Sequence, residues 1–247
     1  MADTAPGAEW IVAGATLRGP AHRRARLPNQ DAWLGRAWQQ GGLLTVADGL
    51  GSRPLAHLGS RAACRAVSTA STRWFRSGSP SVELLLRAIH IDWRLYIHPH
   101  PPTDCATTCL FAAARSGQLV LGQLGDGLVA ALFSDGRLVR LEQTERDFSN
   151  ETTGLGITSS LGEWHIMELP SEGLQAVVLA TDGVSEELDP ANTDGVLRWL
   201  QEELPAIPKR SRSRWLSTEL RGLDAPGRID DRTLAAMITP RDPELAS

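Results

Sequence analysis

The order in which strand-like and helix-like segments follow one another constrains the fold of this chain more than any other sequence feature. Short apolar runs typical of strands come first, two amphipathic stretches of helical length follow, and strands and then helices occur again. Because this order is neither a βαβ alternation nor a purely β pattern, it predicts an α+β fold with helical layers and mostly antiparallel sheets. The predicted strands are residues 10–17, 42–47, 106–114, 118–125, 128–134, 177–180 and 233–239.

Helical spacing of apolar residues predicts a helix pair followed later by shorter helices. The basic stretch at 22–26 and the polar stretch at 144–163 are expected to be loops, and we interpret the second as a flap. Asp135-Gly136 between two apolar runs predicts a hairpin turn without chemical role. The predicted helices are residues 55–75, 80–96, 184–188, 192–204 and 212–220.

The composition is typical of a soluble globular protein, since 42% of the 247 residues are hydrophobic and 22% are charged. The net charge is mild and negative, -4, so we expect no strong attraction to nucleic acid or an anionic membrane. We find no export-signal pattern and no apolar run of membrane-spanning length, and the three cysteines form no CxxC pair. We therefore expect a cytoplasmic monomer with one domain at residues 8–240 and ragged ends at 1–7 and 241–247.

Four short acidic stretches each place an aspartate at or just beyond the end of a strand-like run. A single Asp-Gly is most often a turn, but carboxylates gathered from distant parts of a chain repel one another unless a cation lies among them. Hard divalent cations such as Mg²⁺ and Mn²⁺ prefer oxygen ligands. The pattern therefore favours metal-assisted chemistry. The stretches are 29–32, 46–51, 180–183 and 229–233.

The motifs occur in an order that resembles the metal-dependent serine/threonine protein phosphatases of type 2C, particularly their compact bacterial branch. They are Arg-x-x-x-x-Asp, Asp-Gly-x-Gly, Gly-Asp, Thr-Asp-Gly and Asp-x-x-Thr. Two softer matches, at 103–108 and 154–162, extend the resemblance to nearly the whole chain. The matching residues are Arg26 to Asp31, Asp48 to Gly51, Gly125-Asp126, Thr181 to Gly183 and Asp230 to Thr233.

The resemblance implies a four-layer αββα sandwich, in which two mostly antiparallel sheets are flanked by antiparallel helix pairs and metals bind at one edge. It implies two or three Mg²⁺ or Mn²⁺ ions. Asp48, Asp182 and Asp230 would hold the first ion. Asp48 and the Gly49 carbonyl would hold the second, and Asp126 with Asp182 a third.

The resemblance also implies an activity, namely hydrolysis of phosphoserine or phosphothreonine on a protein. A metal-bridging hydroxide would attack phosphorus directly, Arg26 would grip the phosphate, and Asp31 would orient metal-bound waters. The expected partner is a phosphorylated protein, either a Ser/Thr kinase or its target, and the enzyme would oppose that kinase.

The chain departs from the family pattern at four places. Gln30 replaces a metal-binding glutamate, Leu50 a histidine found in some relatives, and Gly127-Leu128 a Ser-Arg pair. Asp231 replaces an asparagine and is the alternative to Asp230 as ligand. These departures motivate a second hypothesis, a catalytically weak regulator that binds a phosphoprotein or a kinase. A metal-dependent nuclease is a third, against which the mild acidity argues.

Other conspicuous residues have ordinary explanations. The eight tryptophans are dispersed, so packing in the core and at edges explains them before a ligand cage does. The basic residues within 210–214 are expected at a solvated helix start. His98 and His100 are expected in an exposed loop, and His57 on a helix surface.

Overall fold

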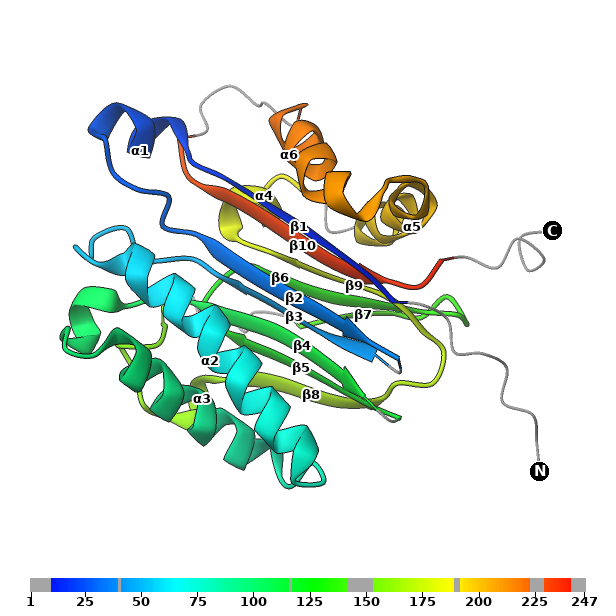
Figure 1. Ribbon diagram of the computed structural model, residues 1–247, viewed down its shortest axis with the longest axis horizontal. Helices are drawn as coiled ribbons and strands as arrows, with labels where there is room; N and C mark the ends of the chain where they lie inside the picture. The colour runs from blue at the N-terminus through cyan, green and yellow to red at the C-terminus, as the bar shows by residue number, and fades with distance from the viewer. Residues whose placement is uncertain are drawn as a thin grey trace.

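Two stacked β-sheets form the centre of the molecule (Figure 1). The computed structural model describes residues 10–39, 41–115, 117–141, 153–188, 192–222 and 229–240. In sheet order, the first sheet contains β1 (Ile11–Leu17), β10 (Arg232–Ile238), β9 (Leu174–Ala180), β6 (Leu128–Phe133) and β7 (Leu138–Arg140). The second contains β2 (Ala32–Trp38), β3 (Gly41–Ala47), β4 (Cys109–Arg115), β5 (Gln118–Leu124) and β8 (His165–Pro170). Every pairing of these strands is antiparallel.

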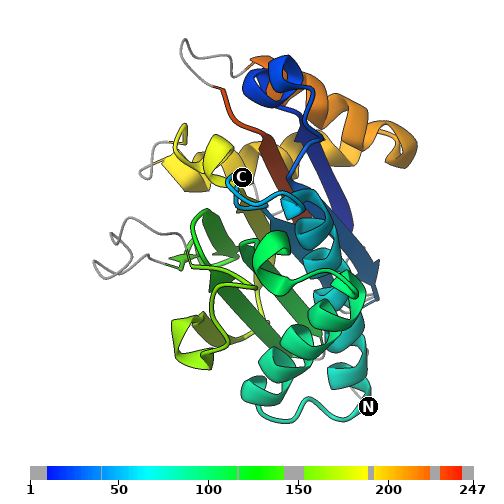
Figure 2. The ribbon, with the colours of Figure 1, turned by 90° about the vertical axis from the view of Figure 1, so that its left-hand side faces the viewer.

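Helices cover the outer face of each sheet, which gives the four αββα layers of the predicted fold (Figures 1 and 2). α2 (Ala56–Arg76) and α3 (Val82–Ile97) lie on the second sheet, and α5 (Thr193–Glu203) and α6 (Arg212–Gly222) on the first. α2 buries mainly small residues (Ala, Gly, Ser and Cys), so its backbone lies close to the sheet. The short helices α1 (Pro20–Ala25) and α4 (Asp182–Ser185) lie at one end of the sandwich, where the candidate site forms. Short 3-10 turns are η1 (Pro102–Cys105), η3 (Leu161–Glu163), η5 (Leu204–Ala206) and η6 (Lys209–Ser211).

The interior strands are apolar along their whole length because both of their faces are covered. All residues of β3 and of β10 are buried, one face against the opposite sheet and the other against helices. The prediction that 177–180 lies inside a sheet is confirmed, since β9 is hydrogen-bonded to both β10 and β6. No helix among the described residues has the length and apolar character needed to cross a bilayer.

Three local predictions differ from the structure. The basic stretch at 22–26 was expected to be a loop, but most of it belongs to α1, which begins at Pro20, a residue whose fixed φ suits a first helical turn. The helix expected at 184–188 is instead Asp182–Ser185. Strands β2 and β8 were not predicted; both lie at the ends of the second sheet, where one edge has no partner strand. Of the predicted flap, residues 144–152 lie outside the described residues.

Candidate active site

Strand register brings the acidic motifs to the same end of the sandwich. Ala32 pairs with Ala47, so Asp31 before β2 lies beside Asp48 after β3. Ala180 at the end of β9 pairs with both Leu128 and Leu234. The segments that carry Asp126, Asp182 and Asp230 therefore meet at this end of the first sheet.

Four of the predicted metal-binding aspartates line one cavity of about 160 Å³. The predicted ligand Gly49 lines it as well, and so does Gln30 from the position of the family's glutamate. Gly51, which closes the Asp-Gly-x-Gly motif, and Leu50, noted above as a departure, also line it, whereas His22 and Thr108 were not singled out from the sequence. The lining consists of His22, Gln30, Asp48, Gly49, Leu50, Gly51, Thr108, Asp126, Asp182 and Asp230.

Two threonines hold the backbone of Asp48 in place. Its N–H donates to Thr108 Oγ1 at 2.8 Å, while its carbonyl accepts from Thr107 Oγ1 at 2.7 Å and from the Thr108 N–H at 2.8 Å. The following Gly49 lies so close to α2 that a Cβ would be 2.7 Å from Ala56. These contacts fix the direction in which Asp48 enters the cavity.

Asp31 is buried behind the cavity wall, with 4% of its surface exposed. Its Oδ2 accepts a hydrogen bond from Thr181 Oγ1 at 2.9 Å, and its Oδ1 has no partner among the described residues. Burial raises the pKa of Asp31 to about 7, and the charge of Asp231 acts in the same direction.

Crowding of carboxylates also perturbs the acids inside the cavity. Burial raises the pKa of Asp48 well above its ordinary value, and the charges of Asp31 and Asp182 raise it further. The pKa of Asp182 is raised to about 6 by burial and by the charges of Asp126 and Asp230. Without a bound cation, burial and mutual repulsion therefore disfavour the state in which all of these aspartates are ionised.

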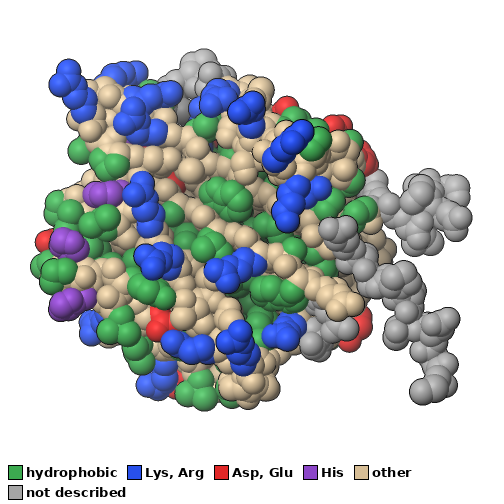
Figure 3. Space-filling view, in the orientation of Figure 1, with side chains coloured by type: hydrophobic (Ala, Val, Ile, Leu, Met, Phe, Trp, Pro, Cys, Tyr) green, Lys and Arg blue, Asp and Glu red, His purple; other side chains and the backbone are tan. Residues whose placement is uncertain are grey.

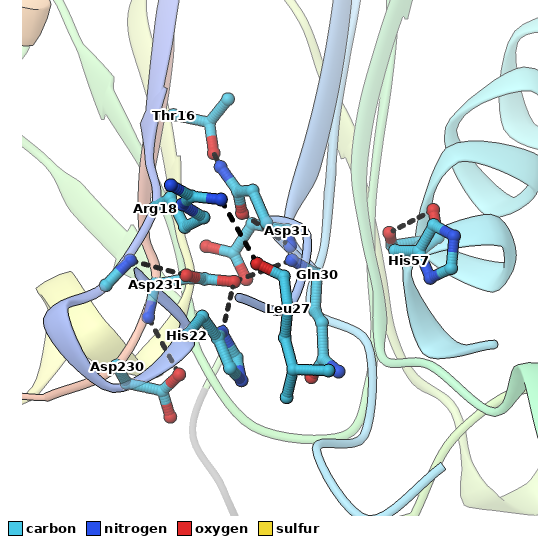
Figure 4. Close-up of polar contacts among 12 residues, drawn as sticks. Thr16, Arg18, His22, Leu27, Gln30, Asp31, His57, Asp230 and Asp231 are labelled. Carbon is cyan, nitrogen blue, oxygen red and sulfur yellow. Dashed lines mark hydrogen bonds and ion pairs between the residues drawn. The ribbon is translucent and has the colours of Figure 1, made fainter. Parts of the chain in front are cut away.

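Asp231 organises the loops around the cavity (Figure 4). Its Oδ1 accepts the Gly19 N–H at 2.5 Å and its Oδ2 the Gln30 N–H at 2.6 Å, and His22 Nδ1 lies 2.9 Å from Oδ2. One buried carboxylate thus joins the start of α1, the approach to β2 and the approach to β10.

The neighbouring Asp230 is exposed and lines the cavity, whereas Asp231 is 1% exposed and does not. The Asp230 Oδ1 accepts the Asp231 N–H at 2.7 Å. His22, Asp230 and Asp231 place potential ligand atoms within 4.8 Å of one another. Asp231 is buried and occupied by two backbone N–H groups, so Asp230 and His22 are the members of this group that face the cavity.

Arg26 is exposed at the C-terminal end of α1 and is not among the residues that line the cavity. Its φ of 57° is left-handed, a conformation that costs a residue with a Cβ roughly 1–2 kcal/mol. Among the described residues, Ser79 is the other non-glycine with a positive φ.

The Gly-Asp-Gly turn that carries Asp126 is braced by a residue that the sequence did not single out. Gln123 Nε2 donates to the Gly125 carbonyl at 3.0 Å and to the Gly127 carbonyl at 3.3 Å. Gly127 has a φ of 122°, and a Cβ there would lie 2.6 Å from the Ala180 carbonyl oxygen. This turn therefore has no room for the serine that relatives carry.

The donor set fits hard divalent cations. Besides the carboxylates, Gln30 Oε1 and Asp31 Oδ1 are buried oxygens without a hydrogen-bond partner among the described residues. Buried oxygens of this kind need a proton donor, a water or a cation. Gln30 is thus positioned to serve as a neutral oxygen donor where relatives have a glutamate.

Sequence reasoning missed His22, Thr108 and Gln123. His22 was grouped with the basic residues around it. Its role depends on Asp231, which is more than 200 positions away in the chain. The softer motif at 103–108 contained Thr108 but gave no reason to choose it over its neighbours.

The sequence profile of the family described as protein phosphatase 2C matches residues 18–221. A comparison with curated proteins finds no match. Among solved structures, the Mycobacterium tuberculosis serine/threonine phosphatase PstP/Ppp is 19% identical with a TM-score of 0.61, over 94% of this chain and 100% of that one. The catalytic domain of PstP in complex with two manganese ions gives 19% identity and 0.60, over 94% and 99%. Stp1 from Staphylococcus aureus gives 14% and 0.61, over 96% and 98%.

The architecture is therefore that of bacterial serine/threonine phosphatases. The profile covers most of the chain, and this protein belongs to the protein phosphatase 2C family. Its enzyme class is accordingly protein phosphatase.

Proposed function

We propose that this protein hydrolyses phosphoserine and phosphothreonine monoesters on a protein substrate, in opposition to a Ser/Thr kinase. The observation that carries the proposal is the cavity in which aspartates from four separate segments converge, in a chain of this family. The kinase itself or one of its targets is the proposed substrate, and the enzyme is proposed to act as a cytoplasmic monomer.

Asp48, Asp182, Asp230 and the Gly49 carbonyl are the proposed ligands of two Mg²⁺ or Mn²⁺ ions, and Asp126 joins Asp182 for a third. When bound, such ions activate water and offset the charge of phosphoryl oxygens. Burial and the charges of Asp31 and Asp182 raise the pKa of Asp48, so a bound cation would stabilise its ionised form.

Other side chains of this protein are proposed to bind the substrate or to orient water. Asp31 Oδ1 is free to accept a hydrogen bond from a cavity water while Thr181 fixes Oδ2. Arg26 follows the cavity-lining His22 by about one helical turn. From there its guanidinium would meet the phosphate of an arriving substrate with a two-pronged hydrogen bond.

The test is an assay of metal-stripped protein with an aryl phosphate and with a phosphothreonine peptide, with and without Mn²⁺. We expect Mn²⁺-dependent turnover of both. Asp48→Asn and Asp182→Asn should each lose at least ~100-fold in rate, equivalent to about 2.7 kcal/mol of barrier. Absence of turnover in both assays, with an intact fold, would refute the proposal. Slow turnover combined with measurable phosphopeptide affinity would instead support the weak regulator.

A further inference from the structure

A second polar surface lies on a different part of the molecule, along strand β2. Two adjoining cavities, of about 640 and 520 Å³, share Arg36, Trp38 and Gln39 as lining residues. We call the two together the edge groove. It has no lining residue in common with the aspartate cavity. Arg36 lies five residues beyond Asp31, about 17 Å along an extended strand.

The edge groove concentrates positive charge in a chain whose net charge is -4. Its five cations come from five elements, β2, α2, β4, η6 and α6. Among the described residues that line it there is no acid, and none of the five cations pairs with a described carboxylate. In Figure 3, basic and hydrophobic side chains cover the middle of this face, and acidic ones lie mainly at its margins. The cations are Arg36, Arg76, Arg115, Lys209 and Arg212.

Aromatic rings form the apolar part of the edge groove, and they are held in place. Trp38 Nε1 donates to the Ala114 carbonyl at 3.1 Å, and its ring meets Phe75 edge-on at 5.8 Å. The Arg115 guanidinium lies 5.7 Å from the Phe75 ring centroid. Trp33 packs against β1 so closely that a Cβ at Gly14 would be 2.5 Å from its ring. The rings thus offer a preformed surface.

The backbone of β2 is also available for pairing. β2 is the end strand of its sheet and is hydrogen-bonded to β3 on one side only. Four consecutive residues at 35–38 line the groove, although alternate residues of a strand point to opposite faces. The groove therefore follows the edge of the strand rather than one face of the sheet.

Charge on an edge strand can simply prevent unwanted pairing with another chain. A single charge on the strand, such as Arg36, suffices for that purpose. The other four cations belong to neighbouring elements and converge on the same groove, which such protection does not require.

We propose that the edge groove binds an extended, acidic segment of a partner protein, which adds to the free edge of β2. Strand addition supplies backbone hydrogen bonds, and alternating side chains supply the specificity. Its carboxylates face the five cations, and its apolar side chains rest on Trp33 on one face and on Trp38 and Phe75 on the other. Each face of the segment therefore carries both acidic and apolar side chains.

The probe is a fluorescently labelled peptide with a repeating Glu-Glu-Val-Val sequence, which puts acidic and apolar side chains on both faces of an added strand. Its binding to the whole protein is followed by anisotropy. We expect binding that weakens as salt is added, because exposed charges are screened. Arg36→Glu/Arg115→Glu should weaken it at least ~10-fold, equivalent to about 1.4 kcal/mol. Both residues are exposed, so the variant should fold and should keep wild-type turnover of an aryl phosphate. Arg94→Glu, at an exposed site on α3, is the matched control and should bind normally.

Two modified peptides test the chemistry of the occupant. A peptide with Lys in place of Glu should not bind. A peptide with alternate backbone nitrogens methylated should bind weakly, because it cannot donate to the β2 edge.

Four results would overturn the proposal. The first is that the wild type does not bind the peptide, and the second is that Arg94→Glu weakens binding as much as the double variant does. The third is that the methylated peptide binds as well as the unmethylated one. The fourth is that the protein binds anionic phospholipid vesicles or inorganic phosphate but not the peptide. A concentration-dependent dimer that Arg36→Glu/Arg115→Glu abolishes would also overturn it, since the occupant would then be a second copy of this chain.

Discussion

At the scale of single residues, two adjacent aspartates have opposite environments. Asp231 is buried and accepts hydrogen bonds from two backbone N–H groups, whereas Asp230 is exposed to the cavity. In Asp231→Asn one acceptor becomes an NH₂ group, so either Gly19 or Gln30 loses its partner. We expect this variant to lose about 1–3 kcal/mol in free energy of unfolding, measured by urea denaturation.

Asp230→Asn is the matched control for that variant. Its amide oxygen can still accept the Asp231 N–H, so stability should stay within about 0.5 kcal/mol of wild type. Its affinity for Mn²⁺, measured by calorimetry, should fall. The opposite pattern, with stability lost at 230 and Mn²⁺ affinity lost at 231, would make Asp231 the ligand.

Arg26 keeps a left-handed backbone that would suit glycine better. The conformation closes α1, where the Arg26 N–H donates to the Arg23 carbonyl, and glycine could adopt it without strain. Arg26→Gly should therefore raise the free energy of unfolding by about 1 kcal/mol and yet raise KM for a phosphothreonine peptide. Ser79→Gly relieves the same strain at the end of α2, far along the chain from the cavity residues, and should stabilise without a change in KM. Equal kinetics in the two variants would remove Arg26 from substrate binding.

Motif spacing pointed to the cavity aspartates because each lies next to the end of a strand. The apolar run of that strand shows in the sequence where the strand ends. It could not locate His22 or Gln123, since their roles depend on single hydrogen-bonding or ion-pair contacts that leave no periodic trace. The choice between Asp230 and Asp231 was likewise open in the sequence. The two differ in burial, which depends on how α1 packs against the start of β10.

At the scale of elements, the turn between β5 and β6 shows why a departure from the family pattern is not a defect. Restoring the family residue with Gly127→Ser should destabilise the protein. The new Cβ would press on the Ala180 carbonyl and on Leu110 Cδ2, at 2.6 and 2.8 Å. We expect a loss of about 1–3 kcal/mol from overpacking, in addition to about 1 kcal/mol from the left-handed φ.

Gly136→Ser is the control for that substitution, because Gly136 also has a positive φ but its Cβ would meet nothing within 4 Å. This variant should lose only the about 1 kcal/mol of stability that comes from placing a side chain at a left-handed φ. Thermal melts of the two variants separate the effects, and similar melting temperatures would show that Ala180 and Leu110 yield to a larger side chain. Gly127→Ser should also reduce turnover, since it displaces Asp126.

Strands covered on both faces were predictable, whereas β2 and β8, the two end strands of the second sheet, were not. β3, β9 and β10 are continuous apolar runs, so their sequences alone indicate interior strands. β2 carries Trp33, Arg36 and Trp38 along the edge groove, and this mixture hides its strand character. The packing role expected of its tryptophans is confirmed, since Trp33 and Trp38 each pack against a buried cluster.

At the scale of the whole molecule, the acid cluster links folding to metal binding. The folded-state pKa values of Asp31 and Asp182, about 7 and about 6, exceed their ordinary value of 3.8. Between pH 4 and 7 the folded metal-free protein therefore holds protons that the unfolded chain releases. Stability falls with rising pH wherever the folded state binds more protons, so the penalty is absent below about pH 4 and complete above about pH 7.

The melting temperature of the protein in a chelator should accordingly fall from pH 5 to pH 8, by about 2–4 °C for each kcal/mol lost. Asp31→Asn removes one of the raised groups, so its melting temperature should depend less on pH and exceed that of wild type at pH 8. Titrating groups away from the cavity are common to both proteins, so the difference between them reports Asp31 together with its effect on the pKa of Asp48. Added Mn²⁺ should stabilise wild type more at pH 8 than at pH 5, because cations bind the deprotonated carboxylates. A wild-type slope that Asp31→Asn leaves unchanged would mean that Asp31 is not the group that couples stability to pH.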